Sequence, residues 1–227
     1  MKKLFITTIA ILLFLTGCSL ESPIEKNDNG KVDKKKSDVV IGVSISTLNN
    51  PFFVKIKDGI EKEAKKQGVK VKFADAQDDA AKQANDIDDL IQQKVDYLIV
   101  NPTDSDAISG SIQIANDEAI PVITLDRDVA KGDVASFIAS DNIKGGEMGG
   151  ELIVDELGED AKVAELEGVP GASATRERGK GFHNVADKSL DVVSKQSAKF
   201  NRTEGLNVTQ NIIQAHPDIK AIFSQND

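Results

Sequence analysis

The sequence of 227 residues is poor in several residue types that functional sites often use. It contains no tryptophan, one tyrosine and nine phenylalanines, so aromatic side chains are scarce. Its single cysteine, Cys18, excludes an intrachain disulfide. The two histidines, His183 and His216, lie on separate predicted helices, and His216 precedes Pro217 at a helix end, which indicates a structural role.

Motifs that accompany common enzymatic chemistry are also missing. The sequence has no G-x-G-x-x-G after a strand, no G-K-[ST] phosphate loop and no H-E-x-x-H pair. No nucleophile lies beside a base in the pattern. We therefore expect a protein that is not an enzyme and that needs no cofactor and no metal. Turnover of a sugar by the purified protein would favour the alternative, an enzyme.

The sequence has fewer positively charged than negatively charged residues. The chain has 28 lysines and arginines against 37 aspartates and glutamates, which gives a net charge of −9 at pH 7. Without a basic cluster in the folded part, this balance argues against a nucleic-acid partner. The charged fraction of 29% and the apolar fraction of 40% are those of an ordinary soluble protein. The length permits one large domain or two small lobes.

The first residues have the pattern of an export signal. Lys2 and Lys3 precede an apolar run over residues 4–15, which is too short to span a bilayer comfortably. The run ends in L-T-G-C, which resembles the lipobox of bacterial lipoproteins. This resemblance implies that residues 1–17 are a signal peptide and that Cys18 carries lipid and anchors the chain to the membrane. The alternative is an ordinary signal peptide with an incidental cysteine.

The segment that follows is expected to lack structure. Residues 18–37 are polar and of mixed charge, so they cannot bury a core and predict a disordered tether. A lipid anchor with a tether is the arrangement expected on the outer face of a Gram-positive cell membrane, or on the periplasmic side in a Gram-negative cell.

The folded part opens with a strand, a polar loop and a helix. Residues 39–45 form a β-branched and apolar run that suits a strand covered on both faces. Asn50 is a good N-cap, Pro51 suits the first helical position, and Gly68 suits the helix end. The loop and the first helical turn are expected at the carboxyl end of the strand, where open α/β sheets bind ligands.

Apolar strands alternate with helical patterns along the rest of the chain. The strands are expected at residues 39–45, 69–74, 96–100, 120–125, 134–139, 162–166, 191–197 and 220–224. This alternation predicts an α/β fold with doubly wound parallel sheets flanked by helices. Residues 126–133 lack a helical pattern, as expected where a strand leaves one sheet and feeds another.

Several segments resemble one family in the same order. These are S-T-L-N-N-P-F-F-V near residue 50, I-T-L-D-R, I-A-S-D-N, the glycine-rich and arginine-rich segment 168–182, and the stretch from G-L-N-V to Q-N-D. They resemble the ribose-binding proteins of bacterial ABC importers, within the type I periplasmic binding protein family. The resemblance runs from Ile41 to Asp227 and implies two lobes, residues 38–140 and an incomplete second lobe, residues 141–227.

Polar segments follow the predicted strands, and the carboxyl ends of parallel strands share one edge. These segments are 46–50, 101–104, 126–127, 140–142, 168–178, 200 and 225–227. By pattern alone, each candidate could be a core, turn or surface residue. The resemblance implies that the following residues contact the sugar: Asn50, Phe52, Phe53, Asp126, Arg127, Arg178, Phe200 and Asn226. Phenylalanine rings suit the apolar faces of a sugar, and Asp, Asn and Arg suit its hydroxyl groups.

The resemblance implies a substrate-binding lipoprotein that captures D-ribose or a similar monosaccharide and delivers it to an ABC transporter permease, acting as a monomer. The alternatives are a receptor for another pentose, a hexose or a furanose signal, and a non-functional remnant of such a receptor. A repressor with the same fold would need a DNA-binding segment where the signal pattern stands. Because the family continues beyond the point that corresponds to Asp227, we expect a C-terminally truncated chain. Such a chain is expected to fold its second lobe poorly and to bind sugar weakly or not at all.

Overall fold

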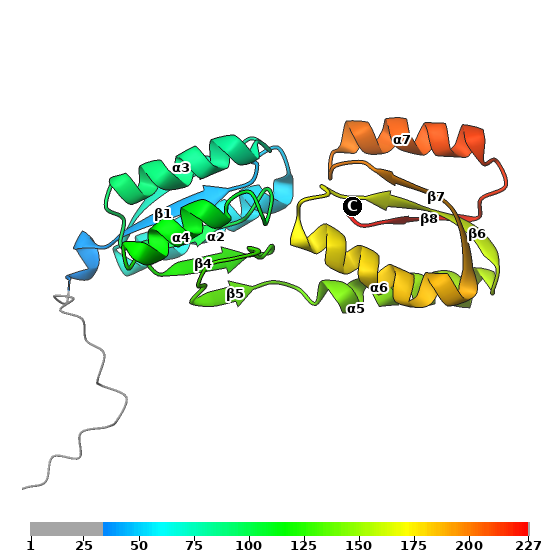
Figure 1. Cartoon of the computed structure of the whole chain (residues 1–227), viewed down its shortest axis with the longest axis horizontal. Coiled ribbons are helices and arrows are strands. Elements are labelled where there is room, and N and C mark those ends of the chain that lie inside the picture. The colour runs from blue at the N-terminus through cyan, green and yellow to red at the C-terminus, as the bar shows by residue number, and fades with distance from the viewer. Residues whose placement is uncertain (1–33, 227) are drawn as a thin grey trace, which may run out of the picture. The chain divides into compact units, whose positions relative to one another are not determined.

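The structure is a computed structural model, and it describes residues 34–226 (Figure 1). The predicted signal peptide, Cys18 and most of the predicted tether lie outside the described residues. Two residues that the sequence places in the tether, Lys36 and Ser37, belong to a short 3-10 helix, η2, at Lys36–Asp38. Within residues 34–226, no helix combines the length and the apolar character needed to cross a bilayer.

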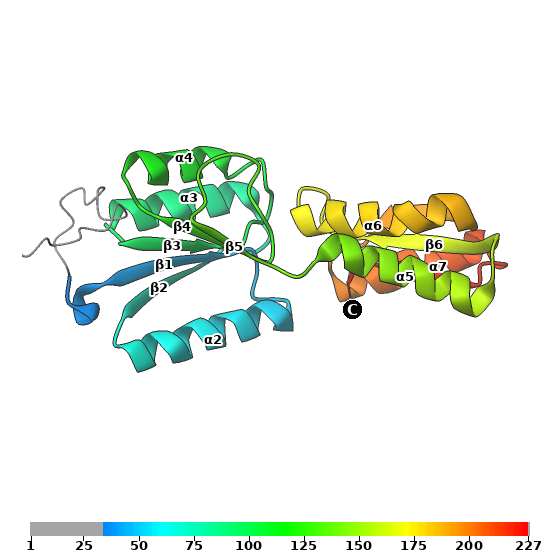
Figure 2. The same cartoon turned by 90° about the horizontal axis from the view of Figure 1, so that it is seen from below.

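The first lobe is a five-stranded parallel sheet with helices on both faces. Its strands lie in the order β2-β1-β3-β4-β5. Its elements are β1 (Val40–Ile45), α2 (Pro51–Gln67), β2 (Lys70–Asp75), α3 (Ala80–Gln92), β3 (Tyr97–Val100), α4 (Ser109–Asp117), β4 (Val122–Leu125) and β5 (Ser136–Ile138). Helix α2 covers one face of the sheet, and α3 and α4 cover the other (Figure 2).

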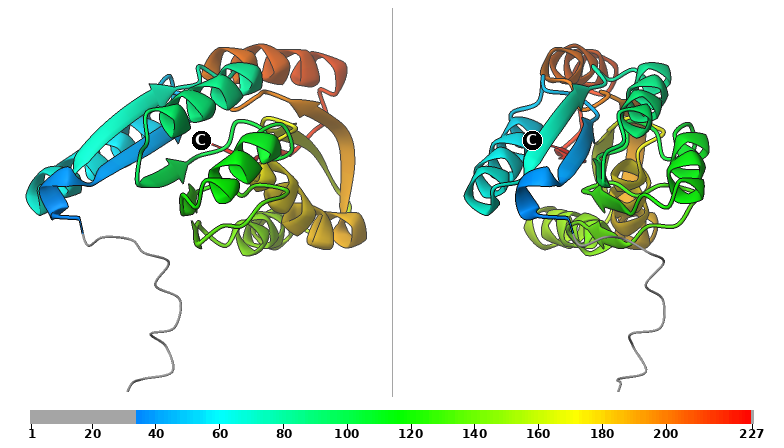
Figure 3. Two further views of the ribbon diagram at one scale, coloured as in Figure 1. Left: turned by 60° about the vertical axis from the view of Figure 1, so that its left-hand side comes forward. Right: turned by 90° about the vertical axis from the view of Figure 1, so that its left-hand side faces the viewer.

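The second lobe repeats this plan with fewer strands. Its three strands are parallel and lie in the order β7-β6-β8. Its elements are α5 (Asn142–Leu157), β6 (Ala161–Glu167), α6 (Ser173–Ser189), β7 (Leu190–Ser197), α7 (Arg202–Ala215) and β8 (Ala221–Ser224). Helix α7, coloured orange, lies on one face of this sheet, and α6 lies on the other (Figures 1 and 3).

Each sheet face has its own apolar cluster, as a doubly wound sheet requires. In the first lobe, Ile87 of α3 and Ile112 of α4 are buried against β3, whereas Phe53 of α2 is buried on the opposite face with Val43. The second lobe has two clusters of the same kind. Ile212 of α7 packs on one face and Phe182 of α6 on the other, where the Phe182 ring stacks on Phe223 at a centroid distance of 4.2 Å.

The structure has all eight predicted strands, with ends that differ by one or two residues. Helix α2 begins and ends as its sequence predicts. Asn50 caps it, Pro51 stands in its first turn, and Gly68 ends it with a left-handed φ of 72°. The segment predicted to lack a helix also lacks one here. Strand β5 pairs with β4 at the edge of the first sheet, and the chain then passes to α5 of the second lobe.

Candidate functional site

The beginning of helix α2 presents two aromatic rings at the end of β1. The Asn50 side-chain oxygen accepts a hydrogen bond of 2.9 Å from the backbone N–H of Phe52, which satisfies one of the unpaired donors of the helix start. Phe53 is buried, whereas Phe52 is 52% exposed. The two rings meet edge to face with centroids 5.3 Å apart. The cap therefore holds an apolar surface beside the polar loop.

Arg127, just after β4, is a buried cation close to two aromatic rings. It is 2% exposed, and its guanidinium carbon lies 5.1 Å from the centre of the Phe53 ring and 5.4 Å from that of Phe200. Its Nη1 donates a hydrogen bond of 3.0 Å to the carbonyl of Pro102. Its Nε is buried and has no hydrogen-bond partner among the described residues. A buried donor that makes no hydrogen bond is costly, which marks this N–H as an unusual feature of the site.

Asp126 stands beside this cation and has a left-handed φ of 63°. Its Oδ2 lies 3.7 Å from Nε of Arg127. Burial raises the pKa of the Asp126 carboxyl, although Arg127, Arg178 and a hydrogen bond with Asn101 act in the opposite direction. Burial also lowers the pKa of Arg127, although Asp126 and Asp78 oppose that change. The site thus holds desolvated charges that only partly compensate each other.

Asn101 joins the strand ends that carry these side chains. Its Oδ1 accepts hydrogen bonds from the backbone N–H of Ser46 at 3.3 Å and from the Ser46 hydroxyl at 2.6 Å. Its Nδ2 donates a hydrogen bond of 2.9 Å to the carbonyl of Leu125. Because these bonds connect the carboxyl ends of β1, β3 and β4, they hold the loop of Arg127 in place relative to the loop that precedes Asn50.

Arg178 of α6 supplies a second guanidinium, from the second lobe. Its Nε donates a hydrogen bond of 2.9 Å to Oδ1 of Asn142, and its Nη1 donates one of 2.6 Å to the backbone carbonyl of Gln225. Asn142 in turn donates to the Glu177 carboxylate at 3.0 Å. The guanidinium carbon of Arg178 lies 5.9 Å from the centre of the Phe200 ring. These bonds orient the fork of Arg178 toward the same ring that covers Arg127.

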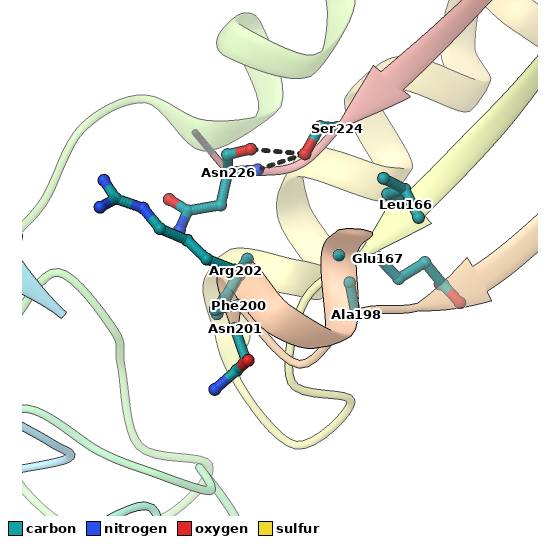
Figure 4. Close-up of a pocket in the computed structure, with 9 residues that line it drawn as sticks. Leu166, Glu167, Ala198, Phe200, Asn201, Arg202, Ser224 and Asn226 are labelled. Carbon is teal, nitrogen blue, oxygen red and sulfur yellow. Dashed lines mark hydrogen bonds between the residues drawn. The ribbon is translucent and has the colours of Figure 1, made fainter. Parts of the chain in front are cut away.

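Phe200 and Asn226 complete the second-lobe side. Phe200 has a left-handed φ of 54° and packs directly on Gly168, where an added Cβ would lie 2.0 Å from the ring. Asn226 follows β8, and its backbone contacts the Ser224 hydroxyl. Both residues also line a neighbouring pocket of about 200 Å³ at the start of α7 (Figure 4).

One cavity brings the sequence-predicted residues together. It has a volume of about 80 Å³ and is lined by Asn50, Phe52, Phe53, Asp126, Arg127, Ala174, Arg178, Phe200 and Asn226. All eight predicted contact residues are among these. An adjoining cavity of about 480 Å³ shares six of them and adds Thr47 and Asp78. Three phenylalanine rings, two guanidinium groups, a carboxylate and two amides therefore line a common space.

Sequence reasoning did not assign Asn101, Asn142 and Gln225 to the site. All three lie in polar segments that follow strands, which was the available signal. Their link to the site is visible only in their hydrogen bonds. Asn142 and Gln225 accept from Arg178, which lines the cavity, and Asn101 donates to Leu125, the residue before Asp126. Within residues 34–226, no group of three or more His, Cys, Asp or Glu side chains is placed to hold a metal ion.

Two hydrogen bonds join the lobes beside this cavity. The backbone N–H of Ser105 donates to the carbonyl of Gly171 at 2.9 Å, and the backbone N–H of Asp128 donates to the Ser173 hydroxyl at 2.8 Å. Gly171 is closely covered, since an added Cβ would lie 1.9 Å from Oδ2 of Asp104. A larger residue at this position would force the Asp104 carboxylate to move.

Two parallel sheets whose strand ends share a cavity of aromatic, amide and charged groups define a two-lobed binding protein for a small polar molecule. The chain belongs to the periplasmic binding protein family, because residues 41–227 match the family model described as periplasmic binding protein domain.

Curated relatives agree over most of the chain. It is 58% identical to the ribose import binding protein RbsB of Bacillus subtilis over 228 aligned residues, which cover all of this chain and 74% of that protein. It is 50% identical to the ribose import binding protein RbsB of Escherichia coli over 188 residues, which cover 82% of this chain and 64% of that protein. The chain therefore spans about two thirds to three quarters of the length of these relatives.

Solved structures have the same fold. The myo-inositol binding protein of Caulobacter, solved with myo-inositol, matches with a TM-score of 0.78 and 33% identity. That match covers 86% of this chain and 68% of the Caulobacter chain. A galactofuranose binding protein matches with a TM-score of 0.78 and 27% identity over 82% of this chain and 66% of its own. These relatives support the two-lobed type I fold with an incomplete second lobe.

Proposed function

We propose that this chain is the substrate-binding protein of an ABC sugar importer and that it captures D-ribose between its two lobes. One observation carries the proposal: Arg127 is buried close to the Phe53 and Phe200 rings and keeps an unpaired Nε donor beside Asp126. The names of the curated relatives, which are ribose import binding proteins, supply the sugar.

The residues around the cavity match the chemistry of a neutral sugar. The phenylalanine rings cover the apolar C–H faces of the sugar and exclude water. Asp126 accepts hydrogen bonds from hydroxyl groups, whereas Asn50, Asn226 and the two arginines donate to sugar oxygens. A site in which each hydroxyl has a partner rejects analogues that lack one, because a buried polar group is then left unpaired.

Sugar binding is coupled to the relative position of the lobes. A ligand that contacts Arg127 in one lobe and Arg178 in the other favours the arrangement in which both can reach it. We place the boundary between the lobes near Ser140, so the hinge lies at this crossing. The loaded protein then docks on a membrane permease as a monomer, without a catalytic step.

Export and anchoring form part of the same proposal. The family consists of exported binding proteins, and the L-T-G-C sequence at Cys18 supports a lipid anchor on the outer face of the cell membrane. Labelling of cells with a radioactive or clickable fatty acid tests this. The unaltered protein should incorporate the label, and Cys18→Ser should not.

A related sugar is the second candidate ligand. Structures similar to this one were solved with myo-inositol, D-allose and D-arabinose, so the fold accepts several polyols and sugars. To decide between these ligands, we would measure the melting temperature of residues 19–227 with excess D-ribose, D-allose, D-arabinose and myo-inositol.

The melting experiment also tests the main proposal. A ligand that binds only the folded state and is present at about a hundred times its Kd adds roughly 2.7 kcal/mol of stability. We expect D-ribose to raise the melting temperature and D-glucose to leave it unchanged. A cooperative melt that none of these sugars moves contradicts sugar binding by this chain.

A further inference from the structure

Gln225, the residue after β8, is buried and uses all of its polar groups. It is 3% exposed. Its backbone N–H donates to the carbonyl of Leu166 at 3.0 Å, and its side-chain oxygen accepts from the backbone N–H of Gly168 at 3.0 Å. Its side-chain nitrogen donates to the Glu165 carboxylate at 2.8 Å, and its carbonyl accepts from Arg178 at 2.6 Å. Four separate bonds therefore determine where this residue lies.

Two of these bonds, together with the chain itself, link Gln225 to residues that line the candidate site. The carbonyl of Gln225 is a direct partner of Arg178. Gly168, which the Gln225 side chain holds, is the surface on which the Phe200 ring packs. Asn226 is the next residue in the chain. The second-lobe side of the cavity thus depends on one glutamine that itself does not line it.

Glu165 on β6 accepts the hydrogen bond from the Gln225 side-chain nitrogen. Its side chain is fully buried, and its second oxygen lies 2.9 Å from Nε2 of His183 and 3.7 Å from Nζ of Lys195. A buried carboxylate is costly unless charged and hydrogen-bonding partners surround it. Here the partners are present, and the oxygen that remains is the one that receives the Gln225 amide. Neither Glu165 nor Gln225 lines the cavity, so any effect of the pair on the site acts through other residues.

Helix α6 leaves room for this pair. At Gly179, an added Cβ would lie 3.0 Å from the Gln225 side-chain nitrogen and 3.4 Å from Oε1 of Glu165. Helix α6 therefore approaches Gln225 and Glu165 closely at Gly179, the residue that follows Arg178. A shift of Gln225 would move the partner of Arg178 directly.

We propose that Gln225, held by Glu165, is the positioning residue for the second-lobe half of the ligand site. In the ligand-free protein, Gln225 fixes the position of the Arg178 guanidinium and that of Gly168, on which Phe200 packs. It also fixes the backbone that leads into Asn226. This inference rests on the proposed function for its consequence, which is tight sugar binding. The positioning itself is measurable without sugar.

The test swaps the glutamine and the glutamate between positions 225 and 165 in two steps. Gln225→Glu places a second carboxylate against Glu165, so the two oxygens repel and the pair separates. Adding Glu165→Gln restores a donor and an acceptor in the reverse order, so the double variant should recover the contact. Gln196→Glu is the matched control, because Gln196 is an exposed glutamine on β7 whose side chain bonds only to Ser194 among the described partners.

The first readout is the NMR signal of the Arg178 Nε–H group in the sugar-free protein, together with hydrogen exchange at the Gly168 amide. We expect Gln225→Glu to shift or broaden the Arg178 signal and to speed exchange at Gly168 about tenfold or more. The double variant should return both toward the values of the unaltered protein, and Gln196→Glu should change neither. Unchanged Arg178 and Gly168 signals in Gln225→Glu, or no recovery in the double variant, would overturn the proposal.

The second readout is D-ribose affinity by calorimetry. We expect Gln225→Glu to weaken binding about tenfold and the double variant to recover most of that loss. If the unaltered chain binds no sugar, the proposed function fails for this chain, whereas the NMR arm still decides the positioning role. If Gln225→Glu does not fold, Gln225→Leu replaces it, because leucine removes both side-chain bonds of Gln225. An unchanged Arg178 signal in Gln225→Leu would then overturn the proposal.

Discussion

The guanidinium of Arg127 lies 5.1 Å from the centre of the Phe53 ring, so the first lobe stacks a buried cation on the ring that begins its first long helix. The same guanidinium lies 5.4 Å from the centre of the Phe200 ring of the second lobe. A planar guanidinium can be covered by rings on both faces while its edge still donates hydrogen bonds. Under the proposed function, this arrangement presents donors in fixed positions to the sugar.

Arg127→Lys should therefore weaken D-ribose binding although the charge is kept. Lysine has no planar face for the rings and no fork for two oxygens. Loss of a desolvated cation–π contact costs roughly 2 kcal/mol, which corresponds to more than about a tenfold loss of affinity. Calorimetry measures this, with the exposed Arg176→Lys as the control. Equal affinity in the two variants would contradict the role given to the planar group.

Asp126→Asn should change the stability of the folded protein and its affinity for D-ribose in opposite directions. Because burial raises the pKa of Asp126 in the folded protein, the folded state holds the proton more tightly than the unfolded state does. The ionised carboxylate therefore lowers stability as the pH rises through its raised folded pKa. We expect Asp126→Asn to raise the melting temperature of the sugar-free protein at pH 7 and to weaken D-ribose binding.

Melts at several pH values check the sign of the Asp126 effect. The stabilisation by Asp126→Asn should shrink below the unfolded pKa of about 3.9, where both states are protonated. A variant that is less stable than the unaltered protein at pH 7 would show that the attraction to Arg127 and Arg178 outweighs burial.

Gly171→Ala should disturb the contact between the lobes. The added Cβ would meet the Asp104 carboxylate at 1.9 Å, and that carboxylate is held by the backbone N–H groups of Asp106 and Ala107. We expect a larger radius of gyration in solution scattering and a lower D-ribose affinity, because the arrangement that binds is less populated. Gly145→Ala is the control, since nothing lies within 4 Å of its added Cβ. Identical scattering and affinity for the two variants would contradict this expectation.

His183 should make stability depend on pH near neutrality. Burial lowers its pKa, but hydrogen bonds to Asp187 and Glu165 and the attraction of both carboxylates raise it above its ordinary value overall. The raised pKa adds stability that is fully present below the unfolded pKa of about 6.5 and is lost as the pH rises through the folded pKa.

His183→Gln should remove this step from a plot of unfolding free energy against pH, as measured by urea titrations between pH 5 and 9. His216→Gln, which alters the histidine at the end of α7, should leave the step in place. A step that persists in His183→Gln would mean that another group is responsible.

The order and type of the structural elements could be predicted from the sequence, because the signals are local. A run of β-branched residues predicts a buried strand, and Asn50, Pro51 and Gly68 mark the ends of α2 within their own neighbourhoods. The eight candidate residues could be named because resemblance to a family identified them among the polar residues that follow strands. Parallel strands place such residues at one edge.

Only the tertiary structure decided which partners these side chains have. Phe53, Arg127 and Phe200 are far apart in the chain, and no local preference reports that the cation lies close to both rings. The link from Glu165 through Gln225 to Arg178 was equally invisible in the sequence. The physical reason is that backbone preferences act over a few residues, whereas desolvation and hydrogen-bond pairing depend on which distant segments the packed sheets bring within a few ångströms.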